Sequence, residues 1–124
     1  MSNYLLTHTA NAPRVELHDA LKLSGAEVSI NALPAGVAVP FVHAHTVNEE
    51  LYIVLEGAGE LYIDGEVVEI KAGDAFRIDP KGHRAIRAAA HSAIRYICIQ
   101  TKAGSLTTFT AGDAKILEEK APWH

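Results

Sequence analysis

The 124-residue sequence is poor in cysteine, in clustered basic residues and in long apolar segments, and each of these absences excludes a class of protein. The single cysteine, Cys98, cannot form an internal disulfide, so a secreted disulfide scaffold is excluded and a reducing, cytoplasmic setting is expected. Fifteen acidic residues face eleven scattered basic ones, so we expect neither nucleic acid nor a membrane surface as a partner. No segment approaches the roughly 20 apolar residues of a membrane span. The N-terminus also lacks the basic lead and apolar stretch of a signal peptide.

What the sequence does contain is a series of short apolar runs separated by turn residues, in a chain of about one-domain length. Closely spaced runs of this kind predict an all-β sandwich or barrel. The expected strands are 26–33, 37–43, 50–55, 59–63, 66–70, 75–78, 83–88, 94–100 and 105–110.

Local signals define a few features between and beside these strands. Asp64-Gly65 between two alternating runs predicts a two-residue hairpin with both central residues at positive φ. Only the stretch 15–23 has helical character, and it is brief. Cys98 lies inside an apolar run, where a free cysteine usually behaves as a small buried hydrophobic residue.

Two histidines and a glutamate fall close together in the first half of the chain. His43 and His45 are two residues apart, so in a strand both imidazoles point to the same face. Glu50 opens the next run, and a tight turn between the two runs would bring its carboxylate beside the imidazoles. Two histidines and one carboxylate are the usual ligand set of non-haem iron, and they also suit manganese, nickel or zinc. The alternative is an exposed strand face on which these side chains are solvated.

Strand alternation also bears on the neighbours of Glu50. Glu49 competes for the carboxylate role, but parity places Glu50, Tyr52 and Val54 on the inward face and Glu49 on the outer one. Tyr52 is therefore a candidate substrate-binding residue that donates a hydrogen bond near the metal. Core packing is the simpler interpretation of a tyrosine in a strand.

The spacing of these residues resembles the first sequence motif of the cupin superfamily. Gly36 is followed by His43-x-His45, then by Glu50, and Gly57 lies seven residues after the glutamate. The resemblance is to the small, single-domain bacterial cupins and implies a double-stranded β-helix, or jelly-roll barrel, holding a divalent transition metal. On this basis residues 26–110 are expected to form the barrel. Residues 1–25 would pack on it as an extension, and residues 111–124 would form a C-terminal tail.

The second cupin motif is present but altered. It runs from Gly73 to Pro80-Lys81-Gly82, and the family would then supply a third histidine ligand. His83 arrives two residues early, and an ungapped count places Arg84 at the usual ligand position. Two arrangements stay open: a shortened turn makes His83 the fourth ligand, or Arg84 points inward and anchors a carboxylate-bearing substrate. An inward Arg84 is also compatible with a barrel that has lost its metal.

The resemblance implies several functions without selecting one of them. The first is a metal-dependent enzyme acting on a small polar or carboxylate-bearing molecule, with dioxygenase, isomerase or lyase chemistry. The others are a non-catalytic barrel that binds a sugar or small acid, and a vestigial metal-free barrel. We also expect a symmetric homodimer, because small cupins commonly pair through their outer sheets and termini.

Overall fold

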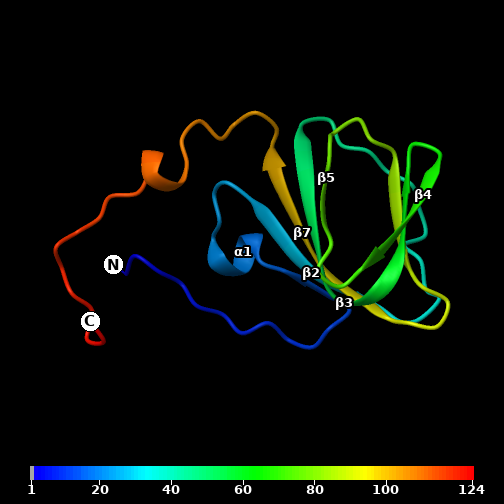
Figure 1. The fold of residues 1–124 in the computed structure, drawn as a ribbon, viewed down its shortest axis with the longest axis horizontal. Helices are drawn as coiled ribbons and strands as arrows, with labels where there is room; N and C mark the ends of the chain where they lie inside the picture. The colour runs from blue at the N-terminus through cyan, green and yellow to red at the C-terminus, as the bar shows by residue number, and fades with distance from the viewer. Residues whose placement is uncertain (1) are drawn as a thin grey trace.

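The structure is a computed structural model that describes residues 2–124, and most of its regular elements are β-strands (Figure 1). In chain order the elements are β1 (Arg14–Glu16), α1 (His18–Leu21), β2 (Glu27–Leu33), β3 (Asn48–Ile63), β4 (Glu66–Lys71), β5 (Ala75–Ile78), β6 (Arg84–Ala88), β7 (Ile94–Lys102) and the 3-10 helix η1 (Thr110–Gly112). The expected all-β jelly-roll architecture is confirmed. None of the helices within residues 2–124 has the length and apolarity that a membrane crossing requires.

Strand β3 belongs to both halves of the barrel. Its first part pairs with β7 and β5, and the strand order on this side is β1-β2-β7-β3-β5. Its second part pairs with β4 on one edge and β6 on the other. All of these pairs are antiparallel. Because one strand passes from the first sheet into the second, the two sheets fold over each other and enclose a shared core.

The passage between sheets occurs at a bulge next to Gly57. The register of β3 against β7 shifts between Val54 and Glu56, and Gly57 has a φ of +78°. A Cβ atom at Gly57 would lie 1.8 Å from the carbonyl oxygen of Ala93, so only glycine fits this close approach. The two strands expected at 50–55 and 59–63 are therefore one bent strand.

Alternating burial along the strands forms the core. On β7, for example, Ile94, Tyr96 and Cys98 are buried while the residues between them are partly exposed. The buried apolar residues are Tyr52, Val54, Leu61, Ile70, Ile78, Ile86, Ala88, Ile94, Tyr96 and Cys98. Their side chains fill one part of the barrel interior and leave the part near Glu50 to polar groups.

The local predictions had mixed outcomes. The Asp64-Gly65 hairpin is confirmed, with φ values of 48° and 89°. The strand expected at 37–43 is wrong, because this segment makes only isolated bridges to β6. The strand expected at 105–110 is also absent from the described chain, and the expected helix at 15–23 is reduced to the four residues of α1. In each case the segment lacks a continuous partner for its backbone groups.

Both terminal segments run away from the barrel on the same side of the molecule (Figure 1). They expose large apolar side chains, which are Tyr4, Leu5, Leu6, Leu106, Phe109, Ile116, Leu117 and Trp123. Ile116 is 98% exposed and Trp123 is 83% exposed. Within one copy of the chain these residues therefore add little to the buried core.

Candidate metal centre

The backbone places His43 and Arg84 directly opposite each other. The amide of each residue donates to the carbonyl of the other, and both N···O distances are 3.0 Å. Side chains of opposed residues in an antiparallel pair project to the same face. The imidazole of His43 and the guanidinium of Arg84 therefore both point into the barrel, where Arg84 is 1% exposed.

Two further contacts bring His45 and Glu50 to the same place. The amide of His45 donates to the carbonyl of Pro80 at 2.8 Å, which fixes the chain just after β5. Glu50 lies in β3 between Ile78 of β5 and Gln100 of β7, so its backbone is paired on both sides. Its side chain faces inward and the residue is 2% exposed. The neighbouring Glu49 is only partly buried and lies outside the cluster.

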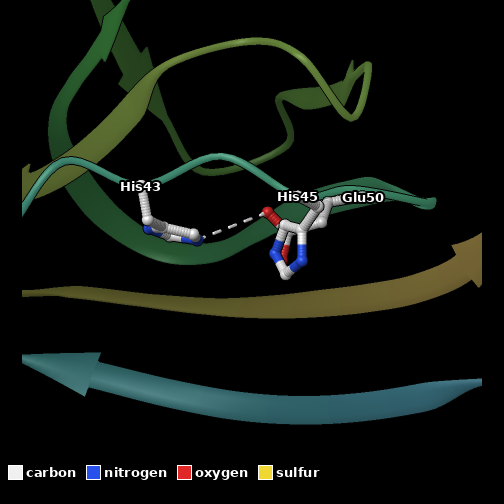
Figure 2. A group of neighbouring side chains, drawn as sticks. All are labelled: His43, His45 and Glu50. Atoms are coloured by element: carbon white, nitrogen blue, oxygen red, sulfur yellow. Dashed lines mark ion pairs between the residues drawn. The ribbon is translucent and has the colours of Figure 1, made fainter.

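The three predicted ligands converge in the structure. Figure 2 shows the imidazoles of His43 and His45 beside the carboxylate of Glu50. The Nε2 atom of His45 lies 3.3 Å from Oε2 of Glu50, and Nε2 of His43 lies 4.0 Å from Oε1. One ligand atom from each residue can be chosen so that all three lie within 4.8 Å of one another. The expected two-histidine, one-carboxylate set is thus assembled on one inward face.

Three donors surround the carboxylate of Glu50. Arg84 Nη1 donates to Oε1 at 2.7 Å, the hydroxyl of Tyr52 donates to the same oxygen at 3.0 Å, and Cys98 Sγ lies 3.2 Å from Oε2. Burial by itself raises the pKa of Glu50, but the hydrogen bonds from Cys98 and Tyr52 and the nearby positive charge of Arg84 outweigh it. The pKa of Glu50 therefore lies below its usual value, and the residue is a carboxylate at neutral pH.

Arg84 is almost fully occupied by protein groups. Its Nε donates to the carbonyl of Gly82 at 3.0 Å, and Nη2 donates to the carbonyls of Asp79 and Pro80 at 2.7 and 3.2 Å. With the bond from Nη1 to Glu50, only one of the five guanidinium N–H groups lacks a partner among the described residues. Arg84 therefore supports the turn at 79–82 and orients Glu50, and it has at most one N–H for a substrate.

The remaining groups fit a divalent transition metal. Nδ1 of His43 and Nε2 of His45 are buried without a hydrogen-bond partner in residues 2–124, although buried polar atoms are normally paired. Imidazole and carboxylate ligands bind such metals at about 2.0–2.2 Å, which places ligand atoms about 3–4 Å apart. Burial lowers the pKa of His43, which keeps its imidazole neutral as a ligand must be. Oε2 of Glu50 is contacted only by the weakly donating thiol of Cys98, so it is available.

Comparison with known proteins agrees with this fold and site. Residues 30–100, more than half of the chain, match the cupin domain family. The chain belongs to the cupin family.

Individual relatives of this cupin come from distant organisms. It is similar to a cupin protein from Bacteroides fragilis, with 55% identity, a TM-score of 0.92, and coverage of 94% of this chain and 99% of that one. It is also similar to a predicted oxalate decarboxylase from Thermotoga maritima, with 26% identity, a TM-score of 0.55, and coverage of 62% and 64%. An uncharacterized protein from Methanocaldococcus jannaschii is 30% identical over 102 residues, which cover 82% of this chain and 74% of the relative.

The cupin's second motif places Arg84, and not His83, beside the metal cluster. His83 is exposed, its amide donates to Oδ1 of Asp64 at 2.8 Å, and its carbonyl accepts the Asp64 amide at 2.9 Å. These two contacts tie His83 to the hairpin turn and turn its side chain away from the barrel interior. Because alternation then directs the next residue inward, Arg84 takes the position that the family's third histidine would hold.

Two side chains of the site have roles that the sequence left open or missed. Tyr52 serves both predicted purposes, because its hydroxyl contacts Glu50 while its ring stacks on Phe76 with centroids 5.0 Å apart. Cys98 is buried, as expected, but its thiol also contacts Glu50. The signal for this contact was parity, since Cys98 lies opposite Tyr52 in the pairing of β3 with β7.

The cluster opens onto a cavity of about 420 Å³ inside the barrel. His43, His45 and Glu50 form one part of its lining, and Arg14, Ser29 and Asn31 of β1 and β2 form another. The apolar lining includes Leu33, Val39, Phe41, Leu61 and Ile86. A partly apolar cavity with a few convergent polar groups is typical of a small-molecule site.

Proposed function

We propose that this cupin holds one divalent transition metal through His43, His45 and Glu50 and acts on a small carboxylate-bearing molecule in the cavity. The observation that carries the metal site is the pair of buried imidazole nitrogens without a partner, next to a carboxylate that keeps one oxygen clear of Arg84. When bound, the metal supplies a Lewis acid with open coordination positions, as O₂-dependent oxidation, isomerisation or lyase reactions require. Iron, manganese, nickel and zinc all suit the donor set.

The charges of the site support an anionic substrate. The negative charge of Glu50 is balanced by Arg84 at 2.7 Å, and His43 is neutral. A divalent cation added to this nearly neutral site leaves an excess of positive charge in a closed, poorly hydrated cavity. An anionic ligand that faces the cluster compensates this charge. The similarity to a predicted oxalate decarboxylase is consistent with a carboxylate ligand.

The residues around the cluster have distinct tasks in this proposal. Arg84 and Tyr52 hold Glu50 by its Oε1 atom, which leaves Oε2 to face the two imidazoles. The tyrosine keeps its proton, because burial raises its pKa, and so it acts as a fixed donor. The apolar lining excludes water from the reacting group and strengthens every charge interaction in the cavity.

The metal content of the purified protein tests this proposal. We expect about one equivalent of metal per chain in protein prepared without a metal-affinity tag, either as isolated or after anaerobic incubation with Fe²⁺, Mn²⁺, Ni²⁺ or Zn²⁺. His45→Ala and Glu50→Gln should lose the metal. His83→Ala and His91→Ala are matched controls, because both histidines are exposed, and they should retain it. Wild-type protein that binds none of these metals would overturn the proposal.

A second candidate, a barrel without metal, is favoured by one observation. Arg84 occupies the inward position of the missing histidine and pairs with Glu50 at 2.7 Å. If this cation excludes the metal, wild-type protein stays metal-free and Arg84→His restores binding, because the substitution supplies a neutral ligand at the same position. If the first proposal holds, wild-type protein and Arg84→His both bind metal.

We also propose that the cupin is a homodimer in which the terminal segments are covered by a second copy. Exposed apolar side chains gather in residues 4–6 and 106–123, and contiguous apolar surface of this kind is uncommon on monomers. Sedimentation equilibrium should give twice the mass of 13.3 kDa. The double variant Ile116→Ser/Leu117→Ser should shift the equilibrium toward monomer. A monomeric wild-type protein at micromolar concentration would contradict this proposal.

A further inference from the structure

Strand β2 buries two polar side chains that the metal cluster does not use. Ser29 is 3% exposed and Asn31 is 6% exposed, and both line the cavity. They are two residues apart, so they share the inward face of the strand. Polar groups at such positions are costly to bury unless they bind something. Their presence therefore points to a ligand on this side of the cavity.

The hydrogen bonds among these residues consume acceptors and leave donors. Arg14 Nη1 donates to Oδ1 of Asn31 at 2.7 Å, and Nδ2 of Asn31 donates to Oγ of Ser29 at 3.0 Å. The Ser29 hydroxyl proton, the second amide proton of Asn31 and further N–H groups of Arg14 have no acceptor within residues 2–124. The Nε of Arg14 is bound to Glu16 at 2.9 Å in an exposed pair, which leaves its Nη groups free for the cavity. We call Arg14, Asn31 and Ser29 the donor cluster.

Strand register places the donor cluster close to the metal cluster. Ser29 lies opposite Cys98 in the pairing of β2 with β7, and the thiol of Cys98 lies 3.2 Å from Glu50 Oε2. Neighbouring strands are about 4.8 Å apart, so the two clusters are separated by the width of about one to two strands. A ligand of a few carbon atoms can span this distance inside the cavity of about 420 Å³.

We propose that the donor cluster binds the second anionic group of a two-headed ligand, so that the molecule this cupin takes is a small dianion. One carboxylate faces His43, His45 and Glu50, and the other group, a carboxylate or a phosphate, accepts from Arg14, Asn31 and Ser29. The first end rests on the proposed metal function. The second end does not, because hydrogen-bond donors and the charge of Arg14 attract an anion without a metal.

Calorimetric titration of the Ni²⁺-treated and the metal-free protein with a series of acids tests this proposal. The probes are acetate and butyrate as monoanions, malonate, succinate and glutarate as dianions of graded length, and phosphonoacetate to compare a phosphonate head with a carboxylate. Wild-type protein should bind one of the dianions at least about tenfold more tightly than the monoanions. Arg14→Gln should weaken that dianion by about tenfold to a hundredfold, as expected for a lost charged hydrogen bond.

Controls separate this outcome from a general loss of structure. Arg77→Gln removes an exposed arginine that pairs with Asp79 outside the cavity, and it should leave every affinity unchanged. Ser29→Ala is a smaller change of the donor cluster and should weaken the dianion by a few-fold with metal content and melting temperature preserved. Arg14→Gln should likewise retain its metal and its weak binding of butyrate.

Each outcome decides between the two proposals. Equal affinity of wild type and Arg14→Gln for the dianions, or no preference for dianions in wild type, overturns the donor cluster even if metal is bound. If no metal binds but dianion binding to the metal-free protein still falls in Arg14→Gln, the donor cluster stands and the metal function fails. A preference for phosphonoacetate over succinate identifies the second group as phosphate-like.

Discussion

Arg84 and Glu50 form an ion pair inside the barrel, with Nη1 and Oε1 2.7 Å apart and side chains 1% and 3% exposed. Three backbone carbonyls bind the rest of the guanidinium, so the positive charge is compensated on every side. The pair stands where the family's fourth ligand would lie, and it therefore links the stability of the barrel to the properties of its site.

Removing one partner of this pair should be far more costly than removing both. Arg84→Met and Glu50→Gln should each lower the free energy of unfolding by about 3–5 kcal/mol, because an uncompensated group stays buried. The double variant should lose clearly less than the sum of the two. Denaturant unfolding measures these values, and Arg87→Met is the control, since its exposed pair with Glu60 contributes less than about 1 kcal/mol. Additive losses would show that the two residues are not coupled.

The stability of the metal-free protein should depend on pH through Glu50. Its pKa is lower in the folded state than its usual value of 4.5, so between the two values the unfolded chain binds more protons. The stabilisation by Glu50 is therefore complete above about pH 4.5 to 5 and is lost as pH falls through the folded-state pKa. The difference in unfolding free energy between wild type and Glu50→Gln, measured with chelator present, should shrink over this range. A constant difference down to pH 3 would contradict this assignment.

The thiol of Cys98 should be unreactive in the native protein. Burial and the adjacent carboxylate of Glu50 raise its pKa from an ordinary 9.0 to about 12, so at pH 8 its thiolate fraction falls about a thousandfold. Reaction with a disulfide reagent should be very slow in buffer and should reach one equivalent per chain in guanidinium chloride. Rapid modification of the native protein at pH 8 would mean that the thiol is accessible and ionised.

Glycine should be required at Gly57 but not at Gly73, although both have positive φ. An alanine Cβ at Gly57 would meet the carbonyl oxygen of Ala93 at 1.8 Å, whereas nothing lies within 4 Å at Gly73. Gly73→Ala should cost about 1–3 kcal/mol from backbone strain alone. Gly57→Ala should cost more than about 4 kcal/mol or prevent folding, because β3 and β7 must separate. Similar melting temperatures for the two variants would show that the bulge can relax.

Much of the site was predictable because strands alternate with a period of two. His43 and His45 on one face, Glu50 rather than Glu49, and the outward Arg77 and Arg87 all follow from parity. The same rule favoured Arg84 as the inward residue, and the structure agrees. The strand expected at 105–110 failed because an apolar run is not a strand unless another strand offers its edge.

The donor cluster and the thiol contact were beyond the reach of the sequence. Arg14, Asn31 and Ser29 meet through the pairing of β1 with β2, and Cys98 reaches Glu50 across the pairing of β3 with β7. Strand order and register of this kind are long-range properties, and no local pattern encodes them. Their side chains also looked ordinary as residues of short apolar runs.

The sequence by itself therefore determined the all-β class, the cupin motifs and the inward face that carries His43, His45 and Glu50, since periodicity and turn chemistry are local. The tertiary structure decided what surrounds that face. It turned His83 outward through its contacts with Asp64, closed Arg84 onto Glu50, and set polar groups of β2 across the cavity. These choices depend on which strands lie side by side, because only their packing brings distant side chains within hydrogen-bond distance.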